Sequence, residues 1–303
     1  MNKTVNCITF TCIIKVNGNL NGSWGEDIIS TIKKIRMPDS TMRTYISGQA
    51  LRRMSRDQLK AMGYHISKKK PDDVANDKQP IPTDADPKAN IDDDVFGYMK
   101  TGGKKTASLS RISPVRVSPA IAMFPYNYER DLGLQNNNDI HAPNRIYETE
   151  ISNNLYVYTV LIETDRVGVL ESESLPIKER KERIKAVIKS FQYLWGGGKQ
   201  SRLLVDPSPK FIAYQSQFIK KPSYLDYINV DENINLNIDL LQNGLDNSKN
   251  ISLKTLFGLD NIIKNHKEIK EKYGDIVNNV NDAFENIYGD IDQMTLSEFN
   301  DRN

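Results

Sequence analysis

Residues 155–170, LYVYTVLIETDRVGVL, give the strongest strand signal in the chain. A strand with so many apolar residues is expected to pair with neighbouring strands inside a sheet. Residues 5–17, VNCITFTCIIKVN, predict a second strand. Its alternate positions are apolar, and these are Ile8, Phe10, Cys12, Ile14 and Val16. Thr9, Thr11 and Lys15 fall on the other face, so the pattern predicts a strand with one side exposed to water.

Two helices are expected between and after these strands. Ser47 suits the N-cap of a helix that ends before Gly63, and the inward stripe is Ala50, Leu51, Met54, Gln58 and Met62. Residues 177–195 predict the second helix, with an inward stripe of Ile184, Val187, Ile188, Phe191 and Trp195. Gly196–Gly198 end that helix and another strand follows. This order matches an α+β fold built on a split βαβ, ferredoxin-like unit with large insertions.

The remaining segments differ in composition. Residues 66–94 are rich in Pro and Asp, which predicts an exposed insertion, with the run Asp92–Asp94 solvated rather than bound to a metal. Residues 119–150 are expected to form a loop or an extended hairpin. Residues 251–290 repeat apolar residues at helical spacing, so 222–303 is expected to be a mostly helical region. Packing of this region on the sheet is favoured over packing on a neighbouring subunit.

The distribution of charge favours a polyanion as partner. The net charge is only +2, but three basic blocks, 1–70, 99–130 and 177–221, alternate with acidic ones. Residues 1–70, for example, carry 13 Lys and Arg against 4 Asp and Glu. If the basic blocks fold together, they form a positive face of the kind that binds nucleic acid. The alternative is that these are solvated helix faces with local ion pairs.

Three stretches are candidates for binding an anion. In YISGQALRR, Gly48 leaves the backbone open to a ligand, and Arg52 and Arg53 oppose the dipole of the helix that they begin. An ordinary amphipathic helix is an equally good interpretation. The loop after residue 195, GGGKQSR, resembles a phosphate-binding loop in composition, but its glycines follow a helix instead of preceding one. The segment 95–118 offers aromatic and basic residues, or simply a hairpin with a basic edge.

The sequence offers no convincing catalytic constellation. None of the three histidines, His65, His141 and His266, has a partner at metal-ligand spacing. We therefore expect no metal, no cofactor and no enzymatic activity. Without a signal peptide or a membrane-spanning segment, the chain is expected to be cytoplasmic and to have no membrane partner. Cys7 and Cys12 should point to opposite faces of their strand as free thiols.

Four stretches in matching order resemble a known family. They are KKIRMPDSTMRTYISGQALRR, DDVFGYM, SLSRISPVRVSPAIA and GGGKQSRLLVDPSP. They are similar to the DevR-type branch of the CRISPR-associated RAMP proteins, the backbone subunit of type I Cascade complexes, and most similar to type I-B. The resemblance covers roughly residues 5–220 and implies three parts. These are an RRM-like palm (1–65 and 151–221), inserted fingers and thumb (66–150, with the thumb within 119–150), and the C-terminal region 222–303.

The resemblance also implies a function. The chain would be a non-catalytic subunit that binds guide crRNA along its phosphate backbone as a helical multimer and presents it to target DNA. Its partners would be crRNA, target DNA through the guide, copies of itself and other Cascade subunits. The RNA-binding candidates carried over from the family are Ser47, Gln49, Arg52, Arg53, Arg111, Arg116, Lys199, Gln200, Ser201 and Arg202.

Two rival functions remain open. One is a metal-dependent ribonuclease of the kind found among type III RAMP backbone subunits, for which Asp27 and Asp39 are the available aspartates. The other is a structural or regulatory protein that assembles with itself without RNA.

Overall fold

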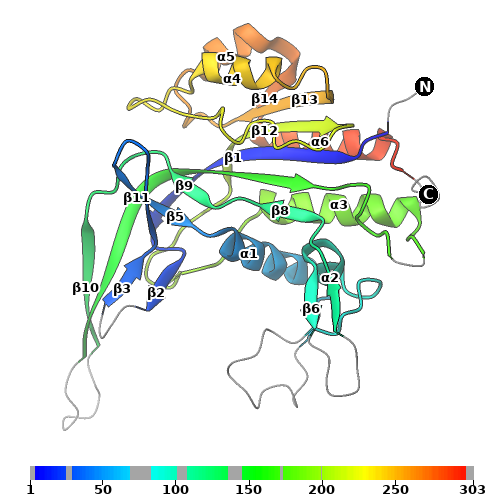
Figure 1. Ribbon diagram of the computed structural model, residues 1–303. Helices are drawn as coiled ribbons and strands as arrows, with labels where there is room; N and C mark the ends of the chain where they lie inside the picture. Colours follow the sequence, from blue (N-terminus) through cyan, green and yellow to red (C-terminus); the bar gives the residue numbers. More distant parts are fainter. Residues whose placement is uncertain are drawn as a thin grey trace.

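The computed structural model describes residues 4–24, 29–68, 83–100, 108–135, 145–170, 173–198 and 200–297, and it has a mixed α+β fold (Figure 1). The helices are α1 Gly48–Ala61, α2 Ile91–Phe96, α3 Ile177–Gln192, α4 Ile238–Asp246, α5 His266–Tyr273 and α6 Val280–Gln293, with a 3-10 turn Gly274–Ile276. None of the helices in these ranges has the length and apolar character needed to cross a membrane.

One large sheet organises the chain, in the order β14-β13-β12-β1-β11-β9-β5-β4. Its strands are β1 Cys7–Gly18, β4 Lys34–Arg36, β5 Met42–Ile46, β9 Ala120–Ala122, β11 Arg145–Ile162, β12 Pro209–Gln217, β13 Ser252–Leu259 and β14 Val277–Asn279. Further strands branch from it or lie apart, and they are β2 Gly22–Trp24, β3 Ile29–Ile32, β6 Tyr98–Lys100, β7 Leu109–Arg111, β8 Val115–Val117 and β10 Glu129–Gln135.

The two strands predicted from the sequence form the centre of this sheet. β1 pairs antiparallel with β11 from Ile8↔Ile162 to Gly18↔Ser152, and with β12 on its other side. β11 runs on past the edge of the sheet, where β10 pairs with it from Glu129↔Ile151 to Gln135↔Arg145. The resulting hairpin projects from the body of the protein (Figure 1). An extended hairpin within 119–150 is therefore confirmed.

The core lies on both faces of the sheet, which corrects the prediction that one face of the first strand is wet at Thr9 and Thr11, whereas Lys15 is exposed as predicted. Helices α1, α3 and α6 pack on the face that carries Phe10, whereas α4 and α5 cover the face that carries Ile13 (Figure 1). Thr9 and Thr11 are buried because this second layer covers them. The Thr11 hydroxyl finds a partner in the Thr159 hydroxyl at 2.8 Å.

The prediction of a solvated Asp92–Asp94 run is wrong. These residues lie in α2 and are buried, because arginines from distant parts of the chain pair with Asp92 and Asp94, and the Ser67 and Thr83 hydroxyls donate to Asp93. Asp94 accepts from Arg111 Nη2 at 2.5 Å, from Arg183 Nη1 at 2.9 Å and from the Gly168 amide. The insertion is thus fixed to α3 and to the turn after β11 through one carboxylate.

The second helix differs in two places from what the sequence pattern indicates. Arg180 and Arg183 lie outside the predicted apolar stripe but are buried, and Arg180 donates to the carbonyl oxygens of Val167 and Thr164. Trp195 is 45% exposed because α3 ends at Gln192, before the apolar stripe reaches this residue. The other four members of the predicted stripe are fully buried.

The helical spacing in 251–290 is confirmed for α5 and α6, but the described part of the C-terminal region is not mostly helical, and it adds strands to the sheet. Residues 252–259 form β13, which pairs antiparallel with β12. Their side chains alternate between the two core layers, since Leu256 packs with α6 and Phe257 packs with α4 and α5. The pairing with a buried neighbour strand decides against a helix here, and α6 lies on the sheet as favoured from the sequence.

We predict that Asp94→Asn lowers the free energy of unfolding by roughly 3–5 kcal/mol, because it removes the charge that neutralises two largely buried arginines. Urea unfolding monitored by circular dichroism measures the difference. Asp226→Asn, at an exposed position of the same charge, is the matched control and should change stability by less than about 0.5 kcal/mol. Equal effects of the two substitutions would contradict the role assigned to Asp94.

Candidate functional site

The start of α1 is fixed by two hydrogen bonds of Ser47. Its hydroxyl accepts from the Ala50 amide at 3.2 Å, which confirms it as the N-cap, and its own amide donates to Asn21 Oδ1 at 2.8 Å. The structure explains why residue 48 is a glycine, which the sequence did not reveal. A Cβ at this position would lie 2.3 Å from the Val117 carbonyl oxygen, so the glycine allows α1 to pack against β8. This packing replaces ligand access as the reason for the glycine.

The two arginines of the first turns differ in their surroundings. Arg53 is exposed and pairs with Asp57 at 3.1 Å, an interaction that solvent weakens. Arg52 is half-buried and has no carboxylate partner among the described residues. Burial and the nearby charge of Arg56 lower the pKa of the Arg52 guanidinium, so its positive charge is uncompensated within this part of the chain. An anion placed beside Arg52 relieves both effects. Gln49 is exposed nearby.

The glycine loop after α3 packs against the start of α1. Gly196, Gly197 and Gly198 all have positive φ, at 103°, 77° and 59°. A Cβ on Gly197 would lie 2.9 Å from Met54 Sδ of α1, and one on Gly198 would lie 2.1 Å from the Asn19 carbonyl oxygen. Three segments far apart in sequence therefore meet here, and we call this place the junction: residues 18–22, residues 47–54, and residues 196–198 with 200–202.

The residues after the glycines have separate roles. Gln200 closes the loop, because it donates to the Gly196 carbonyl at 3.1 Å and accepts from the Val205 amide at 3.0 Å. Ser201 is exposed, and the predicted Lys199 lies outside the described residues. Arg202 pairs with Asp131 and lies 4.7 Å from the centre of the Tyr147 ring. Arg202 thus joins the junction to the β10–β11 hairpin.

The hairpin base adds cations and aromatic rings that sequence reasoning missed. Lys34 lies over the rings of Tyr126 and Tyr128, at 5.2 and 5.6 Å, and Arg130 lies 4.7 Å from Tyr128. Lys34 also pairs with Glu150 at 2.9 Å. The tyrosines were visible in the stretch 119–150, but nothing in their spacing indicated that a lysine from residue 34 would lie against them.

Arg111 and Arg116 lie apart from the junction. Arg111 donates to Asp94 and to the carbonyl oxygens of Arg166 and Val169, so its side chain already has a structural role. Arg116 is 56% exposed and lies 3.4 Å from Glu163. Its neighbours on β8, Val115 and Val117, pack in the core layer of α1, so Arg116 points to the opposite face. Both residues are weaker candidates than those at the junction.

The described residues offer little for catalysis or metal binding. They contain no group of three or more His, Cys, Asp or Glu that is arranged to hold a metal ion. Asp39 lies in an exposed turn, where hydrogen bonds from the Thr41 hydroxyl and amide lower the pKa of its carboxyl. Asp27 lies outside the described residues. Cys7 and Cys12 are free and buried, and burial raises the pKa of the Cys7 thiol to about 12, so it is not an activated nucleophile.

Comparison with known proteins agrees with the fold. The sequence model of a family described as "CRISPR-associated negative auto-regulator DevR/Csa2" matches residues 19–210. A solved structure described as "CRISPR RNA-guided surveillance complex" is similar with a TM-score of 0.54 and 13% identity, over 83% of this chain and 87% of that chain. A second, described as "CRISPR RNA-guided surveillance complex, pre-nicking", has a TM-score of 0.55 and 12% identity, over 89% and 90%. No curated protein sequence matches the chain.

We predict that Gly48→Ala lowers the free energy of unfolding by roughly 1–3 kcal/mol, because the new methyl group collides with the Val117 carbonyl. Gly289→Ala, in the interior of α6, is the matched control. A Cβ at Gly289 meets nothing within 4 Å, so this substitution should stabilise the protein by about 0.5–1 kcal/mol. Thermal unfolding of both variants gives the comparison, and a Gly48→Ala protein as stable as Gly289→Ala would refute the packing argument.

Proposed function

Since the chain belongs to the family of CRISPR-associated proteins described as DevR/Csa2, we propose that it is a non-catalytic subunit of a CRISPR RNA-guided surveillance complex. In this function it binds guide RNA along the phosphate backbone. The two structures that share its fold come from complexes with that description, and they support the proposal at the level of the fold.

The observation that carries the proposal is the junction. Met54 of α1 and Gly197 of the glycine loop are 143 residues apart in the sequence, yet the two segments pack directly on each other at these residues. Each was a candidate for phosphate binding on independent sequence grounds. Their contact brings the helix that carries Arg52 and Arg53 next to the loop that leads to Arg202, and Arg52 lacks a carboxylate partner among the described residues.

The topology supports an RRM-like palm within this function. The strand order β12-β1-β11-β9 has antiparallel neighbours throughout, and α1 and α3 lie on one face, which is the arrangement of a split βαβ unit. We assign residues 1–65 and 151–221 to the palm. Within 66–150, α2 with β6 and β7 belongs to the fingers, and the β10–β11 hairpin is the thumb. In the C-terminal region, α4 and α5 add a second layer to the palm, whereas α6 joins α1 and α3 on the first face.

Binding through phosphates explains how one surface can serve any guide sequence. Phosphate contacts fix the position of a strand and carry no sequence information, whereas base pairing with the guide selects the target DNA. Several copies of this chain would bind successive segments of one guide RNA through the same phosphate contacts. Other subunits would make up the rest of the complex. Such a scaffold needs cations at defined positions and no nucleophile.

The rival function of a metal-dependent ribonuclease receives no specific support. Of its two candidate aspartates, the described one, Asp39, has its carboxylate engaged with Thr41 in an exposed turn. A cut in bound complementary RNA that disappears in Asp39→Ala or Asp27→Ala would favour the rival.

We predict that Arg52→Glu weakens binding of a guide-length RNA by roughly tenfold or more and reduces its dependence on salt. For single strands, each lost phosphate contact should reduce the slope of log K against log salt by about 0.7. Fluorescence anisotropy over a salt series measures both quantities. Lys267→Glu on the exposed surface of α5 makes the same charge change and is the control.

An unchanged slope in Arg52→Glu would remove Arg52 from the interface. The wider proposal is tested by expressing the protein with a CRISPR array and its neighbouring genes, and by sizing the nucleic acid that copurifies. Guide-length RNA protected from nuclease in a multi-copy assembly is expected. A monomer free of nucleic acid would contradict the proposal.

A further inference from the structure

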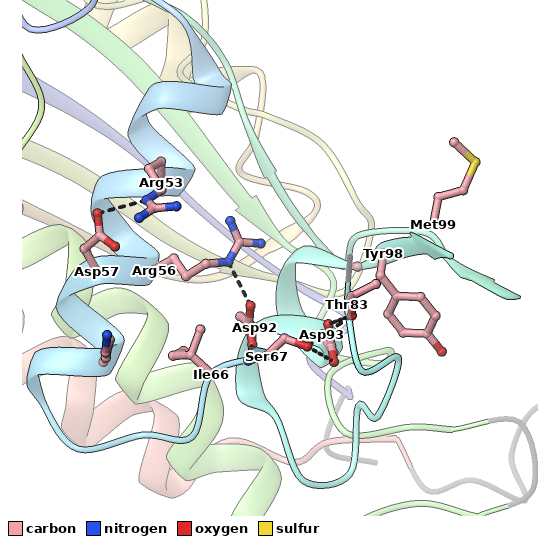
Figure 2. A pocket seen from close by; sticks show the side chains of 12 residues that line it. Arg53, Arg56, Asp57, Ile66, Ser67, Thr83, Asp92, Asp93, Tyr98 and Met99 are labelled. Atoms are coloured by element: carbon pink, nitrogen blue, oxygen red, sulfur yellow. Dashed lines mark hydrogen bonds and ion pairs between the residues drawn. The ribbon is translucent and has the colours of Figure 1, made fainter. Parts of the chain in front are cut away.

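A separate cavity of about 530 Å³ lies between the second half of α1 and the segment that holds α2 and β6 (Figure 2). It shares only Arg53 with the junction. Its volume is within the range of small-ligand sites. One wall is cationic, the floor is acidic, and the opposite wall carries Tyr98 and Met99.

The cationic wall comes from one face of α1. Arg53, Arg56 and Lys60 are spaced by three and four residues, so they lie on the same side of the helix. Lys60 has no carboxylate partner among the described residues, and the pair of Arg53 with Asp57 is exposed and easily exchanged. This wall therefore has two cations available to an anionic group.

The acidic floor does not cancel these cations, because its carboxylates are already engaged. Asp92 accepts from Arg56 Nε at 2.9 Å and from the Ser67 amide at 2.8 Å. Asp93 accepts from the Ser67 and Thr83 hydroxyls at 2.8 and 2.5 Å and from the Asp86 amide. Both aspartates are buried beneath the cavity, with exposed fractions of 4% and 2%.

Arg56 is held as a flat surface at the edge of the cavity. Its guanidinium carbon lies 5.1 Å from the centre of the Phe96 ring, and its Nε is fixed by Asp92. In Figure 2 the two terminal nitrogens of Arg56 point away from Asp92. A guanidinium plane fixed in this way is a surface on which nucleobases stack. Across the cavity, Met99 is 65% exposed and offers an apolar contact.

We propose that this cavity binds one nucleotide, with its base against Arg56 and Met99 and its phosphate at Lys60 and Arg53. The nucleotide is either part of a bound RNA strand, in which case the inference rests on the function proposed above, or a free mononucleotide. Inorganic phosphate alone would use the cations but leave the guanidinium plane and the apolar wall without a partner.

The test uses the full chain, freed of nucleic acid, and isothermal titration with adenosine 5′-monophosphate, ribose 5-phosphate and inorganic phosphate. We expect the mononucleotide to bind at least tenfold more tightly than ribose 5-phosphate. Lys60→Gln should weaken its binding roughly tenfold through loss of a charge-assisted contact. Lys270→Gln, on exposed α5, is the control and should change nothing.

Arg56→Lys separates stacking from charge, because lysine keeps the pairing with Asp92 and has no flat surface. It should reduce mononucleotide affinity to that of ribose 5-phosphate while the melting temperature stays near that of the parent. Equal affinity for the mononucleotide and inorganic phosphate in the parent protein would overturn the proposal.

The source of the nucleotide is decided with guide-length RNA that carries 4-thiouridine. Crosslinks to residues 96–100 that weaken in Lys60→Gln, without binding of the free mononucleotide, would identify a nucleotide within the strand. Mononucleotide binding without RNA binding would refute the proposed function and leave this inference standing. If the variants alter assembly with partner proteins but neither form of nucleotide binding, the cavity receives an acidic peptide and the inference is wrong.

Discussion

The carboxylate of Asp94 connects three parts of the chain that would otherwise be held separately. It accepts from Arg111 in the insertion, from Arg183 on α3 and from the Gly168 amide in the turn after β11. The residues it joins are up to 89 positions apart in sequence. Because the group is fully buried, its charge is tolerable only with these partners in place. The position of α2, and with it the floor and one wall of the cavity beside α1, follows from this contact.

A second constraint acts at the junction, where backbone approaches backbone. Gly48 and Gly198 leave room for the carbonyl oxygens of Val117 and Asn19, and a side chain at either position would separate the segments. Close packing therefore fixes where α1 begins relative to the glycine loop. That precision matters for phosphate binding, because cations on two separate segments act on one strand only if their spacing is constant. Arg52, which has no carboxylate partner among the described residues, lies beside these contacts.

The basic blocks in the sequence separate into two kinds in the structure. The first kind donates hydrogen bonds to buried carboxylates and carbonyl oxygens and stabilises the fold, and its members are Arg111, Arg180 and Arg183. Arg52 and Lys60 have no such partners in the described part of the chain and are available to an external anion. The same residue types at similar local spacing thus have opposite roles. The local density of charge does not predict which basic residues have a structural role. That role depends on which acidic groups, distant in sequence, lie beside each basic side chain in the fold.

The sequence by itself determined the two central strands, the helices α1 and α3, the cap at Ser47 and the stop at Gly63, because alternation, helical periodicity and capping are properties of neighbouring residues. It also supported the family resemblance, which the match over residues 19–210 confirmed. Only the tertiary structure decided that both faces of β1 are buried from Cys7 to Ile14, that residues 252–259 form a strand, and that Asp92–Asp94 lie in the interior. In each case the covering layer, the pairing strand or the opposite charge comes from residues remote in sequence. The local sequence pattern therefore does not predict it.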